Sequence, residues 1–156
     1  MKKLFLVILA AVAVISTSFS VFAMGGVPKQ STSAHADVAT ISKGSQVIAY
    51  YFHGTMRCPT CHKLEQYSKE AIESNFKDAL DSGKLKFREV NIDDKGNEHY
   101  GSDYQLYTKS LILSLVKDGK EAKWVNLDKI WEYVGNKQRF IDYVKNAVSD
   151  LLKEAK

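Results

Sequence analysis

Cys58 and Cys61 are the only cysteines in the chain, and they stand in the run Cys58-Pro59-Thr60-Cys61. Two thiols at this spacing can exchange disulfides as a pair, because one forms a mixed disulfide with a partner and the other then attacks that bond. A purely stabilising disulfide is the alternative, but a bridge that closes so few residues removes little entropy from the unfolded chain. The spacing therefore favours a dithiol that reacts.

The residues around Cys58 indicate that it is the attacking member of the pair. Pro59 suits the first position of a helix, since its ring fixes φ and its missing N–H would have had no partner there. Cys58 then caps the helix, and its sulfur meets unpaired amides at the positive end of the helix dipole. Arg57, and to a lesser extent His62 and Lys63, add positive charge nearby. Together these features predict a lowered pKa for the Cys58 thiol.

Cys61 is expected one helical turn deeper, on the same face of the helix as Cys58. Its sulfur can then reach a mixed disulfide on Cys58, release the reduced partner and close the intramolecular bridge. Cys61 is thus the predicted resolving cysteine, with Thr60 in the turn between the two.

Hydrophobic periodicity predicts the elements that position this motif. Residues 46–53 are dense in β-branched and aromatic side chains, which is typical of a strand buried on both faces. From Cys61 the apolar residues recur at helical spacing, and Asp81-Ser82-Gly83 ends the helix. Residues 84–92 form a second strand, which should lie parallel to the first because a helix connects the two.

The second half of the chain supplies two more strands and three helices. The expected elements are a helix over 98–107, a strand over 111–116, a turn at Lys117-Asp118-Gly119-Lys120, a strand over 121–125, a short helix through Ile130 and Trp131 capped by Asn126 or Asp128, and a final helix from Asn136. The sequence therefore predicts an α/β fold. Its mixed central sheet has three core strands plus a terminal hairpin strand, and helices flank both faces.

Aromatic and acidic residues outside the motif are expected to have structural roles. Tyr100, Tyr104 and Tyr107 recur at helical spacing and should pack one face of the 98–107 helix on the sheet. Trp124 and Trp131 are likewise expected to be packing residues. The acidic residues of the segment 93–98 fit no calcium-binding loop, so we expect a solvated loop there.

The first 23 residues have the pattern of a secretory signal peptide. Lys2 and Lys3 precede an apolar run over 4–15, and Ser20-Val21-Phe22-Ala23 offers small residues around a cleavage site. An uncleaved anchor is the alternative, since residues 4–23 carry no charge and have about the length of a membrane span. Residues 24–45 are rich in Gly, Ser, Ala and Thr, which predicts a flexible tether. Residues 46–156 are expected to form the folded domain. We expect the protein in the periplasm or outside the cell, with no stable membrane insertion after cleavage.

Composition and charge are those of one globular domain. The chain has 156 residues, of which 45% are hydrophobic and 26% charged. Part of its net charge of +4 comes from Lys2 and Lys3, and no basic run is interleaved with aromatic residues. Nucleic acid is therefore not an expected partner.

With these elements in place, the chain resembles the thioredoxin-like superfamily. The resemblance covers about residues 46–156 and rests on C-P-T-C between a strand and a helix, followed by a strand, a helix, a hairpin and a closing helix. More narrowly, YYFHGTMRCPTCHKLE is similar to an exported bacterial branch of that superfamily. The resemblance implies cofactor-free exchange with protein or small-molecule thiols, with Cys58 attacking and Cys61 resolving. A member that reduces its clients in an oxidising compartment would need a membrane-embedded electron donor.

Three features near the motif depart from the family pattern. Members usually carry a cis-proline at the start of the third core strand, where it aligns the substrate backbone, but residues 107–111 here read Tyr-Thr-Lys-Ser-Leu. A buried acid in the strand before the motif would fall at Tyr50 or Phe52, so the proton acceptor for Cys61 is unassigned. His53 or a water can serve, although a histidine that ends a strand is more often a hydrogen-bonded surface residue. The usual tryptophan before the first cysteine is replaced by Met56-Arg57.

Two other functions match the same residues. Cys58 to His62 satisfies the C-x-x-C-H signature of c-type haem attachment, with His62 as one axial ligand and His99 as a candidate second. The strand-like runs around the site argue against the helical wrap of a haem protein. Met56 to Cys61 also matches the M-x-C-x-x-C loop of soft-metal carriers, although those domains are roughly half this length.

Overall fold

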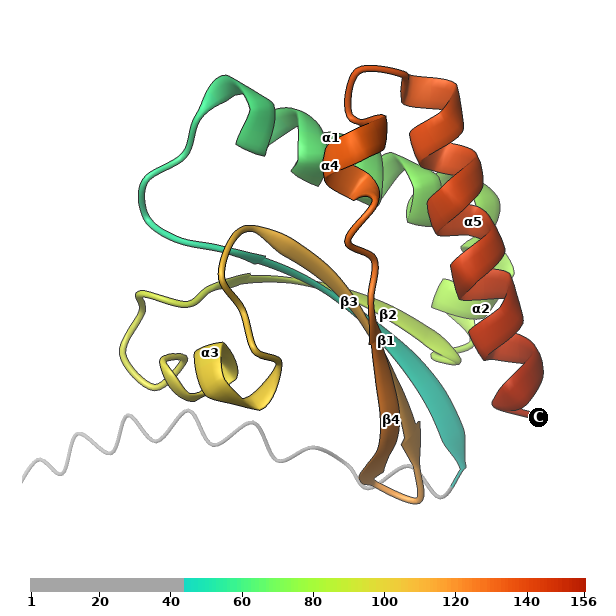
Figure 1. The fold of residues 1–156 in the computed structure, drawn as a ribbon. Coiled ribbons are helices and arrows are strands. Elements are labelled where there is room, and N and C mark those ends of the chain that lie inside the picture. The colour runs from blue at the N-terminus through green and yellow to red at the C-terminus, as the bar shows by residue number, and fades with distance from the viewer. Residues whose placement is uncertain (1–43) are drawn as a thin grey trace, which may run out of the picture. The chain divides into compact units, whose positions relative to one another are not determined.

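The computed structural model describes residues 44–156, and the expected signal peptide and most of the expected tether lie outside them. Four strands form one mixed sheet in the order β2-β1-β3-β4 (Figure 1). They are β1 (Ser45–His53), β2 (Leu85–Asn91), β3 (Ser110–Lys117) and β4 (Lys120–Asn126). Strand β1 is parallel to β2 and antiparallel to β3, and β3 is antiparallel to β4. The expected sheet of three core strands and a hairpin strand is confirmed.

Helices cover both faces of the sheet, as expected. They are α1 (Pro59–Asn75), α2 (Lys77–Asp81), α3 (His99–Asp103), α4 (Ile130–Tyr133) and α5 (Lys137–Glu154). Figure 1 shows α1 and α5 together over one face and α3 against the other. The described part of the chain contains no helix long and apolar enough to cross a membrane.

The face under α1 and α5 holds the larger part of the core. Alternate residues of β1 point to this face, among them Tyr51, because side chains of a strand alternate between its two sides. They meet Leu64 and Ile72 of α1 and the apolar stripe of α5, and all of these are buried. That stripe consists of Phe140, Val144, Val148 and Leu151, the residues at the expected helical spacing.

The opposite face carries a smaller aromatic cluster under α3. Tyr50 and Phe52 of β1 stack on each other, and Tyr100 and Tyr104 pack against them. The prediction was wrong for Tyr107, which is 95% exposed. Helix α3 ends at Asp103 and Gln105 adopts a φ of 51°, so the left-handed turn carries the chain away from the helix before Tyr107.

Other element boundaries follow the sequence with two exceptions. The long helix expected up to residue 81 is broken at Phe76, whose backbone leaves the helical region and separates α1 from α2. Helix α4 begins without a side-chain cap, so neither Asn126 nor Asp128 has the expected capping role. Asn136 does cap α5, because its side-chain oxygen accepts a hydrogen bond from the N–H of Arg139 at 3.1 Å.

Candidate active site

Cys58 lies at the N-terminus of α1, at the end of the loop that joins β1 to this helix. It is the N-cap residue, with extended backbone angles, and Pro59 is the first residue of the helix. The Sγ of Cys58 accepts a hydrogen bond from the N–H of Cys61 at 3.1 Å. The sulfur therefore occupies the capping position expected from the sequence, where partial positive charge from the helix stabilises a thiolate.

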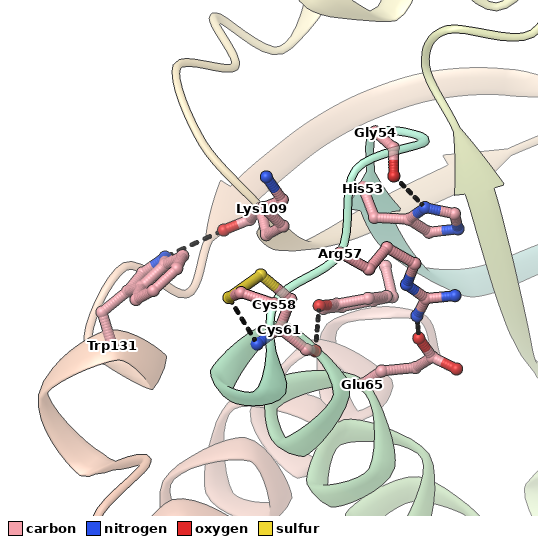
Figure 2. The surroundings of a disulfide bond; sticks show 9 residues. His53, Gly54, Arg57, Cys58, Cys61, Glu65, Lys109 and Trp131 are labelled. Carbon is pink, nitrogen blue, oxygen red and sulfur yellow. Dashed lines mark hydrogen bonds and ion pairs between the residues drawn. A yellow bond between two sulfur atoms is a disulfide. The ribbon is translucent and has the colours of Figure 1, made fainter.

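The two cysteines form a disulfide with each other (Figure 2), and their Cα atoms are 5.0 Å apart. Cys58 is exposed, whereas Cys61 is only 2% exposed. A partner from solution can therefore approach Cys58 directly but has little access to Cys61. Pro59 and His62 lie exposed on the same end of the helix, and Thr60 is half-buried.

Tyr51 lies directly beneath the motif, a residue that the sequence analysis did not select. It is fully buried, and its hydroxyl donates a hydrogen bond to the carbonyl oxygen of Cys61 at 2.8 Å. Burial, offset in part by the charge of Arg57, raises the pKa of Tyr51 to about 12. A group that holds its proton so firmly anchors the first turn of α1 and does not take a proton from Cys61. The two-residue period of a strand, which puts Tyr51 on the same face as Val47 and Ala49, is the signal that could have identified it.

His53 is a buried residue, with 8% exposure, and not the surface histidine that is usual at a strand end. Its Nδ1 lies 2.9 Å from the carbonyl oxygen of Gly54, and its Nε2 lies 3.3 Å from Oε1 of Glu89. Because a carbonyl oxygen only accepts, Nδ1 carries the hydrogen of that bond. Both ring nitrogens therefore face partners other than the cysteines.

Arg57 is paired with carboxylates, which changes its expected effect on Cys58. Its guanidinium forms ion pairs with Glu65 of α1 and with Glu89 of β2, the latter at 3.2 Å. Figure 2 shows this guanidinium on the side of the motif away from the sulfurs. Two carboxylates compensate its charge, so the helix terminus is the nearer source of positive potential at Cys58. Lys63 is exposed on α1.

The loop between β1 and α1 is fastened to the segment that follows β2. Oδ2 of Asp93 accepts a hydrogen bond from the N–H of Thr55 at 2.7 Å, and Nδ2 of Asn91 donates to the Thr55 hydroxyl at 3.2 Å. A Cβ on Gly54 would lie 2.9 Å from the same Asp93 oxygen, so only glycine leaves room for this contact. The acidic segment expected to be merely solvated therefore holds the loop that leads to Cys58.

Comparison with known proteins finds similarity only among solved structures; no family model and no curated protein matches the chain. The chain is similar to a thioredoxin from Fasciola hepatica, at 19% identity over 61% of this chain and 84% of that one, with a TM-score of 0.35. It is also similar to Trxlp from Edwardsiella tarda, at 15% identity over 67% of this chain and 84% of that one, with a TM-score of 0.40.

Similarity of this degree carries no conclusion about activity, so the strand order, the strand directions and the place of the two cysteines decide the fold. A strand, the Cys-x-x-Cys helix and a parallel strand are followed by an antiparallel hairpin and a closing helix. The fold is thioredoxin-like.

The thioredoxin-like fold is built here without the proline that usually opens the third core strand. At that position the carbonyl oxygen of Lys109 accepts a hydrogen bond from the indole N–H of Trp131 at 2.9 Å. The Ser110 hydroxyl donates to the carbonyl oxygen of Thr108 at 3.0 Å. Figure 2 shows Trp131 and Lys109 on the sulfur side of the motif. Trp131 is 37% exposed, so this residue, which we expected to be a packing residue, is also part of the rim of the site.

A cavity of about 250 Å³ opens beside the loop that precedes Cys58. It lies between three segments: the end of β1 with the loop after it, the start of the loop after β2, and the segment before β3. Its lining residues are Phe52, His53, Gly54, Met56, Ile92, Asp93, Leu106, Tyr107, Thr108 and Lys109. The site thus combines an exposed sulfur with an adjoining hollow.

The structure does not bring the candidate haem ligands His62 and His99 together. Within residues 44–156 there is no group of three or more His, Cys, Asp and Glu side chains placed to hold a metal ion. His62 lies on α1 and His99 on α3, and these helices cover opposite faces of the sheet. His99 is instead paired with Asp103, at 2.7 Å.

Proposed function

We propose that this protein is an exported thiol–disulfide oxidoreductase that works through Cys58 and Cys61. The observation that carries the proposal is the asymmetry of the pair: an exposed sulfur at a helix N-terminus is bonded to a sulfur that solvent does not reach. Such an arrangement suits one cysteine for attack and the other for resolution.

The exchange conserves electrons without a cofactor. In the reducing direction the Cys58 thiolate attacks one sulfur of a client disulfide, and the other client sulfur leaves as a thiolate. The Cys61 thiolate then attacks Sγ of Cys58, which breaks the mixed disulfide and releases the second client thiolate. The client gains two electrons and the dithiol becomes the disulfide seen in the structure. The oxidising direction is the same sequence of steps in reverse.

Clients are thiols or disulfides of proteins or small molecules, and the working compartment is the periplasm or the cell exterior. The export part of the proposal rests on the amino-terminal pattern of residues 1–23. If the protein acts as a reductant there, a membrane-embedded donor supplies its electrons. Amino-terminal sequencing of protein recovered from cells tests export, and an intact Met1 would contradict cleavage.

The same observation ranks the alternative functions below the proposed one. A c-type haem is attached through both sulfurs, but Cys61, in the first turn of α1, is only 2% exposed. A soft-metal carrier also uses both sulfurs as ligands, and the burial of Cys61 leaves only Cys58 accessible to an exchanging partner.

Two cysteine variants test the proposal. Cys58→Ser should abolish disulfide exchange, whereas Cys61→Ser should accumulate mixed disulfides on Cys58 because nothing resolves them. Insulin reduction measures the first effect and mass spectrometry of the alkylated protein measures the second. Full insulin-reducing activity retained in both variants would contradict the mechanism. An intense Soret band, or a soft metal ion bound at stoichiometric amount in the purified protein, would instead support one of the alternatives.

A further inference from the structure

The two most exposed large hydrophobic side chains of the described residues lie at one place. Met56 is 83% exposed and Tyr107 is 95% exposed, and both line the cavity of about 250 Å³ beside the Cys58 loop. They come from segments about fifty residues apart in the sequence, the loop before α1 and the loop before β3. Large apolar side chains that gather around a hollow at the edge of a reactive site indicate a contact surface.

The inside of this cavity suits one apolar side chain. Phe52, Ile92 and Leu106 add apolar surface to the lining, next to Met56 and Tyr107. Of the polar lining residues, Asp93 already accepts from the Thr55 N–H, and His53 already bonds Gly54. A cavity of about 150 Å³ with apolar walls holds a molecule as large as benzene, so the volume here is sufficient for a leucine or phenylalanine side chain.

The backbone next to the cavity is poorly suited to accept hydrogen bonds from a client. In the thioredoxin-like family the start of the third core strand aligns the substrate backbone. Here the Thr108 carbonyl oxygen accepts from the Ser110 hydroxyl, and the Lys109 carbonyl oxygen accepts from the Trp131 indole. The two carbonyl oxygens just before β3 are thus already engaged by side chains of the protein itself.

We propose that the protein recognises polypeptide clients by an apolar side chain next to the reacting cysteine, which enters the cavity beside Met56 and Tyr107. Side-chain capture thus replaces much of the main-chain pairing at the start of β3. This inference rests on the proposed function, because it concerns clients of the same dithiol.

This proposal is tested by measuring how fast the reduced protein, without residues 1–23, reacts with a series of short peptides. Each peptide has one cysteine, blocked as a mixed disulfide with 5-thio-2-nitrobenzoate, and either leucine or serine at one of the positions flanking that cysteine. Cys58 attacks the peptide sulfur and the coloured thiolate leaves; Cys61 then releases the peptide thiol. The ratio of second-order rate constants, leucine over serine, should reach about tenfold at the best position, which corresponds to about 1.4 kcal/mol.

Variants of the cavity mouth link this ratio to the surface. Met56→Ser and Tyr107→Ser change exposed side chains and should each lower the ratio toward one. Val125→Ser, a matched change of an apolar residue on β4 that is 41% exposed, should leave it unchanged. Because the measured quantity is a ratio, a general change in dithiol reactivity cancels.

The outcomes separate this inference from the proposed function. Release of thiolate at equal rates from all peptides, or a leucine preference that survives in the Met56→Ser/Tyr107→Ser double variant, would overturn the inference alone. Failure to release thiolate from any peptide would overturn the proposed function itself.

Discussion

The two sides of the loop that carries Cys58 differ in how their side chains are bonded. On one side, here called the anchored side, Tyr51, His53, Arg57 and Asp93 each have a partner within the chain. These four residues are buried or fixed by hydrogen bonds and ion pairs to Cys61, Gly54, Glu89 and Thr55, respectively. This side sets the position of the helix terminus and has little freedom to respond to a partner.

The other side, here called the open side, consists of Met56, Cys58, Tyr107 and Trp131. Three of these are well exposed, and Trp131 is 37% exposed with its N–H bonded to a carbonyl. A reactive sulfur can therefore be both precisely placed and accessible: bonded residues fix the loop, and two of them, His53 and Asp93, also form part of the wall of the cavity next to exposed Met56 and Tyr107. Substitutions on the anchored side should therefore change stability, and those on the open side should change recognition.

The largest effect on the anchored side is expected at alkaline pH for Tyr51→Phe. In the native protein burial raises the pKa of Tyr51 to about 12, whereas in the unfolded chain the phenol ionises near pH 10. The unfolded state therefore binds fewer protons above pH 10, and native stability falls by up to about 1.4 kcal/mol per pH unit between about pH 10 and about pH 12. Phenylalanine removes this contribution, so the variant should lose stability less steeply over that window.

Urea unfolding at a series of pH values measures this difference. At neutral pH the variant should be less stable by about 0.5–1.5 kcal/mol, because the hydrogen bond from the phenol to the Cys61 carbonyl is lost. Parallel curves for the two proteins above about pH 10 would show that Tyr51 does not keep its proton in the native state.

A smaller loss of stability is expected when the hydrogen bond between the Thr55 N–H and Asp93 is strained. Gly54→Ala places a Cβ 2.9 Å from Oδ2 of Asp93, closer than the two atoms can pack, and should displace the carboxylate from the Thr55 N–H. The expected loss of stability is about 1–2 kcal/mol, in line with a strained contact plus a weakened charged hydrogen bond.

Gly101→Ala is the matched control for this variant. Nothing lies within 4 Å of a Cβ at Gly101, which is inside α3, so alanine should stabilise the protein by roughly 0.4–1 kcal/mol. Thermal unfolding of the two variants checks the opposite signs. A neutral Gly54→Ala would mean that Asp93 moves away at little cost and does not hold the loop.

Most of the fold was predictable because it depends on short-range patterns. The continuous apolar run of β1, the apolar stripe of α5 and the Asp-Gly turn at residues 118–119 are visible in the sequence. Both turn residues have the positive φ that this turn requires. The break at Phe76 and the early end of α3 were not predictable, since the periodicity continues through both. In each case the backbone angle of one residue, not the hydrophobic pattern, ends the helix.

The site was predictable only in its local part. The capping sulfur and the bridge follow from spacing, because Cys58 and Cys61 are three residues apart. The Thr55–Asp93 and Arg57–Glu89 contacts join residues 38 and 32 positions apart and leave no local signal. They depend on the register of β1 and β2, which aligns His53 with Asn91 and thereby brings the two following loops together.

The smallest effect on stability, and the most direct probe of the open side, is expected for Trp131→Phe. The variant keeps an aromatic ring but loses the N–H bonded to Lys109, which should lower the free energy of unfolding by about 0.5–1.5 kcal/mol.

Figure 2 shows the indole on the sulfur side of the motif, where the disulfide should quench its fluorescence. Reduction should therefore raise the emission of the protein and of a Trp124→Phe variant, since Trp124 packs against Tyr104 under α3. In Trp131→Phe reduction should change the emission little. Equal increases in the two single-tryptophan variants would place Trp131 away from the sulfurs and return it to a packing role alone. Trp131→Phe also frees the Lys109 carbonyl oxygen to accept a hydrogen bond from a client backbone. If side-chain capture compensates for missing main-chain pairing, this variant should lower the leucine-over-serine ratio of rate constants toward one.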